Sequence, residues 1–326
     1  MTTTTYHETF REDERLPFSH AFARGEYSGI GSISHKRVNT RQRISYMTFT
    51  KVVIVGATGN VGKPITNAFI EKKFDVLVIS RDAAKAKEVF HDKVKYAELK
   101  DYNDVDAIAK VLQGYEVVIS TLSSGNGGLN EQVNLIKAAQ KAKVTRFVPS
   151  EWAWENSVVH VFEEKAKIRK QLESSGLEWT YFIVGYFSEY IWSPWFGWDV
   201  EKNSFKLIGS KDSKISFTDL PTIGKYAAAF INHPSSKNAY VRFAADTVTY
   251  GEAQAKLEKW LGKKITIEYT DPEIVKAKFE KEGKSYDNLF DQLKYDIGTS
   301  RVVVEKSQNS TFPEIKGKTF EEFHKK

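Results

Sequence analysis

The chain has 326 residues, and its 41% hydrophobic and 28% charged residues are enough for one large domain or two modest ones with a sizeable core. The absence of cysteine excludes disulfides, thiolate metal sites and cysteine nucleophiles. The formal net charge of +6 is scattered among mixed Lys/Glu stretches, so it does not favour a nucleic-acid partner. No apolar run reaches the about 18–20 residues of a membrane span. We expect a cytoplasmic protein that binds a small molecule and no membrane.

Residues 1–46 show neither a helical nor a strand period, and we predict that they form a disordered tail. Their scattered arginines are typical of a targeting presequence, but Glu8, Glu12 and Glu14 are not. A weak targeting segment and nucleic-acid binding through the basic tail stay open as alternatives. The compact fold is expected to begin at Met47.

From Met47 onward, β-branched apolar runs alternate with segments of helical period. Strands are predicted at residues 51–55, 75–80, 93–98, 117–121 and 146–149. Helices are predicted between them at residues 63–73, 83–90, 105–112 and 129–141. This alternation predicts βαβ units, and therefore an α/β protein with the doubly wound parallel sheet of a Rossmann domain over residues 47–155.

The regular alternation of strands and helices ends after residue 155. A helix at 162–175 and a strand at 179–184 are followed by a strongly aromatic stretch. The further predictions are short strands at 205–208 and 215–217, helices at 223–231 and 250–261, and Lys/Glu-rich helices over the last sixty residues. We expect residues 156–326 to form a smaller C-terminal α/β part that binds the substrate and contributes elements back to the Rossmann sheet.

Three glycines with the spacing GxxGxxG stand between the first strand and the first helix. Gly56 allows a sharp turn, Gly59 lets a phosphate approach the backbone, and Gly62 permits close packing of helix on strand. The helix then presents its N–H groups and its positive dipole end to an anion. Because the glycines follow a buried strand and open a helix, they predict a site for the diphosphate of a dinucleotide. The residues predicted to bind it are Gly56, Thr58, Gly59, Asn60, Val61 and Gly62.

The end of the second strand predicts which dinucleotide is bound. An NAD site usually has an acidic residue there, whereas this chain has Ser80 and Arg81, with Lys85 one turn further. An arginine pairs well with a 2′-phosphate, so NADP(H) is favoured. Asp82 follows too late in the chain for the usual ribose contact. The other residues expected near the coenzyme are Thr121, Leu122, Ser123, Pro149 and Lys165.

Lys165 is the main catalytic candidate. Typical short-chain dehydrogenases use Tyr-x-x-x-Lys on one helix, but Val161 occupies the tyrosine position, so a tyrosine mechanism is unsupported. A lysine in an apolar pocket has a lowered pKa and can donate a proton near neutral pH; a solvated surface lysine is the alternative. Ser150 is a candidate substrate or ribose contact, or else a helix cap. His160 is either an acid/base partner or structural, and the histidines lack metal-ligand spacing, so no metal is expected.

Aromatic residues lie on both sides of Lys165 in the sequence. We expect a pocket in which a planar substrate stacks on aromatic rings. Its predicted lining residues are Trp152, Trp154, Tyr186, Phe187 and Trp192. Packing in a core or a lid is the alternative interpretation of these side chains.

From about residue 48 onward, the chain resembles the NmrA-like, isoflavone reductase-like family of atypical short-chain dehydrogenases. The resemblance rests on residues 56–62 (GATGNVG), 146–151 (RFVPSE), 162–169 (FEEKAKIR), 176–181 (GLEWTY) and 217–224 (FTDLPTIG). It implies that NADPH delivers hydride to an aromatic, often phenylpropanoid-type, substrate while Lys165 assists proton transfer. Residues 152–154 (WAW) replace a Phe-Gly that is common in the family, so the resemblance does not define the substrate.

Two functions are compatible with these residues. The first is an NADPH-dependent reductase of a small aromatic or conjugated carbonyl-type compound, with Lys165 as proton donor or electrostatic stabiliser. The alternative is a non-catalytic regulator of the NmrA type, which senses NADP(H) and binds a protein partner. Lys165 and the aromatic residues favour the first function, and the absence of tyrosine at position 161 keeps the second open.

Overall fold

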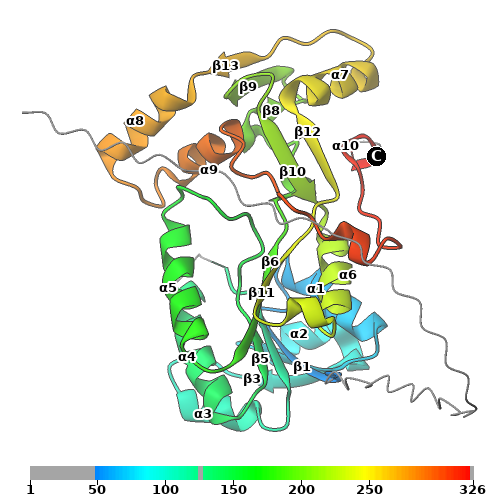
Figure 1. The fold of residues 1–326 in the computed structure, drawn as a ribbon, viewed down its shortest axis with the longest axis vertical. Helices are drawn as coiled ribbons and strands as arrows, with labels where there is room; N and C mark the ends of the chain where they lie inside the picture. Colours follow the sequence, from blue (N-terminus) through cyan, green and yellow to red (C-terminus); the bar gives the residue numbers. More distant parts are fainter. Residues whose placement is uncertain (1–47, 124–127, 324–326) are drawn as a thin grey trace, which may run out of the picture. The chain divides into compact units, whose positions relative to one another are not determined.

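The computed structural model describes residues 48–123 and 128–323, so the predicted tail lies outside the described residues. Within these residues, the main sheet has seven parallel strands in the order β11-β6-β5-β4-β1-β2-β3. Figure 1 shows this sheet with helices on both sides of it. The strands are β1 (Lys51–Val55), β2 (Asp75–Ser80), β3 (Lys95–Glu98), β4 (Val117–Ser120), β5 (Arg146–Val148), β6 (Glu178–Ile183) and β11 (Ala239–Arg242). β1 pairs with both β2 and β4, so the order reverses there and the predicted doubly wound sheet is confirmed.

Helices cover the sheet on both faces. Side chains alternate between the faces along a strand, and in β1 Val52 and Ile54 pack in one core cluster while Val53 and Val55 pack in the other. The helices on the first face are α1 (Gly62–Glu71), α2 (Ala83–Phe90) and α6 (Leu220–Phe230). The helices on the second face are α3 (Val105–Val111), α4 (Gly128–Lys141) and α5 (Val161–Glu173).

Elements from beyond residue 155 complete this sheet. β6 pairs with β5, and β11 pairs with β6 at the edge. β11 was not among the predicted strands; its pairing with β6 at the edge of the sheet makes it a strand. Two three-stranded sheets, β12-β10-β7 and β13-β9-β8, make up the other sheets of the described residues. Their strands are β7 (Tyr186–Phe187), β8 (Trp198–Asp199), β9 (Ser204–Ile208), β10 (Lys214–Thr218), β12 (Asp246–Thr249) and β13 (Glu268–Thr270).

The C-terminal part is less helical than the sequence predicts. After α5 and α6, its helices are α7 (Tyr250–Leu261), α8 (Pro272–Glu282), α9 (Leu289–Gly298) and the single turn α10 (Phe320–Phe323). Between α9 and α10 the predicted helix is wrong, and a 3-10 turn at Asn309–Thr311 is the one helical piece described there. Val304 N–H donates to Ser216 Oγ at 3.0 Å, and Gln308 N–H donates to Arg242 O at 2.7 Å. Bonds to β10 and β11 therefore take the place of intrahelical ones.

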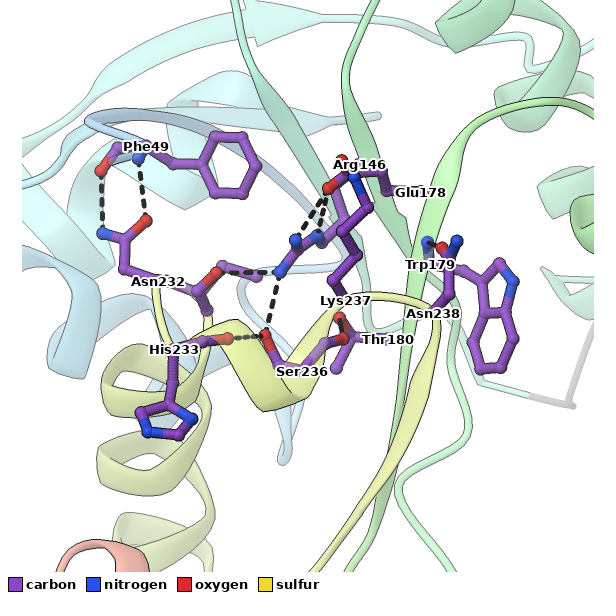
Figure 2. Close-up of polar contacts among 11 residues, drawn as sticks. Phe49, Arg146, Glu178, Trp179, Thr180, Asn232, His233, Ser236, Lys237 and Asn238 are labelled. Carbon is purple, nitrogen blue, oxygen red and sulfur yellow. Dashed lines mark hydrogen bonds and ion pairs between the residues drawn. The ribbon is translucent and has the colours of Figure 1, made fainter. Parts of the chain in front are cut away.

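Arg146, the first residue of β5, is buried and joins three segments (Figure 2). Its Nε and Nη2 donate to Glu178 Oε2 at 3.1 and 2.7 Å. Its Nη1 donates to Ile231 O and to Ser236 Oγ, both at 2.9 Å. Lys237 Nζ lies 2.5 Å from the other carboxylate oxygen of Glu178. The guanidinium thus connects β5, β6 and the segment between α6 and β11.

Arg146→Met is expected to lower the free energy of unfolding by about 3 kcal/mol, because it removes a buried partner of the Glu178 carboxylate. Lys237→Met removes a lysine side chain that is 58% exposed, and it should cost less than about 1 kcal/mol. Urea unfolding at neutral pH measures both variants. Equal losses in the two variants would contradict a special role for the buried guanidinium.

A low pH should weaken the stabilisation that the Arg146–Glu178 ion pair provides. Burial raises the pKa of Glu178, but hydrogen bonds from Lys237 and Arg146 outweigh burial and hold the pKa below its ordinary value of 4.5. Because the pKa in the folded state lies below that in the unfolded state, the contribution is present above pH 4.5 and is lost as the pH falls through the folded-state pKa. The difference in unfolding free energy between wild type and Arg146→Met is therefore expected to shrink in acid.

Candidate active site

A cavity of about 650 Å³ lies at the carboxyl edge of the main sheet. The residues that directly follow β1, β2 and β4 line it, namely Gly56, Arg81 and Thr121. Ser150 and Gly185, which come shortly after β5 and β6, line it too. Ligands of open α/β sheets bind at this edge, beside the strand where the order reverses. The cavity is therefore the candidate active site.

The GxxGxxG loop borders this cavity. Gly56 has a φ of +82°, and Gly59 N–H donates to its carbonyl oxygen at 3.0 Å, so the loop turns tightly. A Cβ at Gly62 would lie 2.2 Å from Gly56 O and 2.7 Å from Thr121 Oγ1, so Gly62 packs under the loop and does not line the cavity. The loop residues that line it are Gly56, Thr58, Gly59, Asn60 and Val61.

The first turn of α1 is suited to an anion. Val61 at the N-cap makes no side-chain hydrogen bond to the helix, and the first turn contains no acidic residue. A phosphate beside Gly59 and Asn60 would therefore meet backbone N–H groups and the positive end of the helix dipole. Asn60 Nδ2 also donates to Tyr190 Oη at 2.8 Å, which links the loop to the aromatic segment. The loop therefore fits the diphosphate that the sequence predicts.

The predicted 2′-phosphate residues separate in the structure. Arg81 lines the cavity, whereas Lys85 lies exposed on α2 and does not. Ser80 also lies outside the lining, where its Oγ donates to Asp82 O at 2.8 Å. The Asp82 carboxylate accepts from Lys85 N–H at 2.9 Å and caps α2. The acidic residue near the strand end therefore serves the helix, and Arg81 is left as the charged group beside the cavity.

The residues after β4 and β5 form the next part of the lining. Thr121, Leu122 and Ser123 line the cavity, and Thr121 Oγ1 donates to Val55 O at 2.9 Å. Ser150 lines it as well, with its N–H donating to Gln132 Oε1 at 2.8 Å. Because α5 begins only at Val161, the helix-cap alternative for Ser150 is wrong. The cavity lining does not include Pro149.

Lys165 lies on α5 with its ammonium turned into the protein. It is 9% exposed and lines the cavity, so the alternative of a solvated surface lysine is wrong. Nζ donates to Glu151 O at 2.5 Å and lies 4.9 Å from the ring centre of Phe162. Burial lowers the pKa of Lys165; the charge of Glu151 opposes this shift and that of Arg169 adds to it. The result is a fixed amine that releases a proton more readily than an exposed lysine does.

Glu151 is a residue to which the sequence analysis assigned no role. Its carboxylate is buried and accepts from Arg169 Nη1 at 2.9 Å. Burial raises the pKa of Glu151, while the positive charges of Lys165 and Arg169 oppose the rise. The position of Glu151 directly after Ser150, shortly beyond β5, was the signal in the sequence.

His160 does not join Lys165 at the cavity. It directly precedes α5, its backbone N–H donates to Gln292 Oε1 at 2.8 Å, and its ring packs edge-on against Tyr286. It is not among the residues that line the cavity. The structural interpretation of His160 fits these contacts.

Four of the five predicted aromatic residues line the cavity, namely Trp152, Trp154, Tyr186 and Phe187. The hydroxyl of Tyr186 is buried and has no hydrogen-bond partner among the described residues, which makes it a polar group for a ligand to meet. Trp192 does not line the cavity. It packs in the C-terminal core, with ring centres 5.7 Å from Trp198 and 5.0 Å from Phe320. Core packing, the alternative interpretation, thus describes Trp192.

Some of the residues that line the cavity were not among the predicted site residues. Leu289, Phe290 and Leu293 of α9 line the cavity, as do Tyr190 and Phe196 of the aromatic segment. Tyr190 and Phe196 belong to an aromatic-rich stretch that could have identified them. No local signal marks the residues of α9, because they reach the cavity through the fold of the C-terminal part.

Residues 48–324 match the NmrA-like family. This chain belongs to the NmrA-like family. It is similar to phenylcoumaran benzylic ether reductase Pyrc5 of Pyrus communis, with 29% identity over 245 residues that cover 69% of this chain and 79% of the relative. It is also similar to oxidoreductase aprR of Aspergillus flavus, with 27% identity over 235 residues that cover 68% of this chain and 78% of the relative.

Solved structures share the fold of this NmrA-like chain. The leucoanthocyanidin reductase–NADPH complex of Vitis vinifera is similar with a TM-score of 0.70 and 22% identity, covering 83% of this chain and 97% of that one. A crystal structure of isoflavone reductase is similar with a TM-score of 0.72 and 24% identity, covering 85% of this chain and 98% of that one. These likenesses confirm the Rossmann-type α/β fold.

The described part of this NmrA-like chain contains no group of three or more His, Cys, Asp or Glu residues arranged to hold a metal ion. Over residues 48–123 and 128–323, every helix is too short or too polar to pass through a membrane. The cytoplasmic location stays a prediction.

Proposed function

We propose that this chain is an NADPH-dependent reductase of a small aromatic or conjugated carbonyl-type compound. One observation carries the proposal: Lys165 is buried on the wall of the same cavity that the glycine loop borders. The names of the relatives, among them phenylcoumaran benzylic ether reductase and isoflavone reductase-like protein, support a reductase. The similar structure of leucoanthocyanidin reductase is that of a complex with NADPH, which supports NADPH as the coenzyme of this chain.

The cavity lining offers a path for a dinucleotide. Gly59, Asn60 and Val61 would hold its diphosphate, and Arg81 would pair with its 2′-phosphate. Thr121, Leu122 and Ser123 also line the cavity and would contact the nicotinamide half. When bound, NADPH supplies a hydride to the substrate.

Lys165 acts as the proton donor. Its Nζ is held by Glu151 O at 2.5 Å, so the amine keeps one position instead of sampling many rotamers. Nζ gives its proton to the substrate atom on which negative charge develops, and water restores the proton afterwards. Trp152, Trp154 and Tyr186 form the aromatic wall that limits access of water and stacks on a planar substrate.

A panel of aromatic enones and related conjugated carbonyl compounds, offered with NADPH, tests this proposal. We expect at least one compound to be reduced, with loss of NADPH absorbance and formation of the reduced product. The regulator alternative rests on Val161, which stands where a catalytic tyrosine would. Tight NADP(H) binding without turnover of any compound, together with capture of a specific protein partner, would favour that alternative.

Arg81→Asp is expected to weaken NADPH binding by about 100-fold and NADH binding far less, because the 2′-phosphate loses a charge-assisted partner and gains a repelling carboxylate. Calorimetric titration of both coenzymes measures the effect. Lys85→Asp is the matched control, because Lys85 lies outside the cavity, and it should leave both affinities unchanged. Equal losses for NADPH and NADH in Arg81→Asp would reject the pairing with the 2′-phosphate.

A further inference from the structure

Helix α9 reaches the candidate active site from the C-terminal part of the chain. Leu289, Phe290 and Leu293 on one side of the helix line the cavity. Gln292 and Asp296 lie one turn apart on the helix, and both are fully buried, with 0% exposure. Buried polar side chains need partners, so the contacts of these two residues indicate what α9 does besides forming a wall.

Asp296 binds the connecting segment, which we define as residues 151–160 between β5 and α5. Its Oδ2 accepts from Trp154 Nε1 at 3.0 Å and from Ser157 Oγ. Its Oδ1 accepts from Val158 N–H at 3.1 Å and lies 3.9 Å from Arg301 Nε. One carboxylate therefore receives three hydrogen bonds from a single irregular segment.

Gln292 binds the end of the same connecting segment. Its Oε1 accepts from His160 N–H at 2.8 Å, directly before α5 begins. Its Nε2 donates to Ser285 O at 3.0 Å and to Asn288 Oδ1 at 2.5 Å, so the orientation of the amide is set. The last part of the connecting segment is thus fastened to α9 by two side chains.

The start of the connecting segment is fastened to the Rossmann part. Glu151 O accepts from Lys165 Nζ, and Trp152 Nε1 donates to Ser120 O at 2.9 Å. Trp154 lies between these two sets of contacts and lines the cavity, with its ring centre 5.4 Å from that of Phe162. The backbone before Trp154 is held by Ala153 O, which accepts from Val184 N–H at 2.7 Å, and the indole ring itself is held by the bond from its Nε1 to Asp296.

We infer that Asp296 is a positioning residue, which holds the Trp154 ring as a fixed wall of the substrate pocket through its hydrogen bonds to the connecting segment. A buried carboxylate that lost these donors would be left without hydrogen-bond partners in an apolar interior, so the segment cannot drift from α9. A fixed indole face favours a planar ring over a bulky aliphatic group, because only the planar ring stacks on it. Asp296 thereby contributes to substrate selection without contacting the cavity.

Asp296→Asn tests the inference, because an amide keeps the size but turns an NH₂ group toward at least one of the donors. The chain has seven tryptophans, and their indole N–H signals can be followed by NMR, with Trp154→Phe identifying the signal of Trp154. We expect that signal alone to move strongly in Asp296→Asn, with the affinity for NADPH unchanged. Asp291→Asn is the matched control on the same helix, because its carboxylate pairs with Lys278 instead.

The kinetic arm rests on the proposed function. With a substrate found in the panel, kcat/KM is expected to fall on the order of 100-fold in Asp296→Asn, mainly through a higher KM, because the wall is misplaced. An unmoved Trp154 signal, or kinetics equal to those of Asp291→Asn, would overturn the inference. A shift of all seven indole signals together with lost NADPH affinity would also overturn it, since that result shows a general structural role.

Ser157→Ala covers the case in which Asp296→Asn does not fold. It removes one donor and keeps the charge, so a smaller movement of the Trp154 signal is expected, and no movement overturns the inference. The reductase function and the positioning role of Asp296 can be rejected independently of each other. If wild type reduces no compound but the Trp154 signal still moves in the variants, the reductase proposal is rejected and the positioning role of Asp296 stands.

Discussion

Lys165→Met is expected to lower kcat by about 100- to 10,000-fold while NADPH binding is retained, because a positioned proton donor contributes about this much to rate. Methionine removes the cost of burying an ammonium ion but also removes the positive charge beside the buried Glu151 carboxylate, which Arg169 still pairs. Because these two effects oppose each other, only a small change in Tm is expected. Steady-state turnover, coenzyme titration and thermal unfolding measure the three effects. Lys167→Met, an exposed lysine on the same helix, should change none of them.

The pH dependence of kcat provides a second test of Lys165. Burial lowers its pKa below the ordinary value of 10.5. The protonated amine donates, so kcat is expected to fall as the pH rises through the lowered pKa, and this limb should be absent in Lys165→Met. An unchanged kcat in the variant would contradict the catalytic role.

Gly62→Ala is expected to abolish measurable NADPH binding and to lower the free energy of unfolding by about 1–3 kcal/mol. The added Cβ would lie 2.2 Å from Gly56 O and 2.8 Å from Ala57 Cα, so the loop must move away from α1. Calorimetric titration with NADPH and urea unfolding measure the two losses. Normal coenzyme affinity in this variant would show that the loop does not hold the diphosphate.

Gly59→Ala is expected to separate the loss of NADPH binding from the loss of stability. A Cβ at Gly59 would approach only Gly56 O, at 3.3 Å, so the fold can accept it with a small adjustment. Gly59 lines the cavity, however, and the methyl group would stand where a phosphate approaches the backbone. We expect near-normal stability with weakened NADPH binding. Gly251→Ala in α7, whose Cβ would lie 3.3 Å from Lys211 O, is the control that should keep both properties.

The parts of the protein that depend on residues close together in the sequence could be predicted from it. The continuous apolar run of β1 requires cover on both faces of a sheet, and the structure has helices on both. The spacing of Gly56, Gly59 and Gly62 predicted a tight loop before a helix, and the structure has that loop. β11 was not predicted, and its pairing with β6, which is far away in the sequence, is what makes it a strand.

Individual side chains of the site were harder to predict. Trp154 and Trp192 both lie in aromatic stretches of the sequence, yet Trp154 lines the cavity and Trp192 packs in the C-terminal core. His160 is near Lys165 in the sequence, but its backbone N–H donates to Gln292 on α9. Which way a side chain points depends on the elements packed beside it, and sequence spacing does not contain that information.

Strand periodicity and glycine spacing act over a few residues, so the amino-acid sequence alone specified the doubly wound sheet, the phosphate loop and the strand end that carries Arg81. The burial of Lys165 and the wall formed by α9 arose only on folding. The bond from Trp154 to Asp296 joins residues 142 positions apart in the chain. Contacts of that range form when separate layers pack together, and no local pattern encodes them.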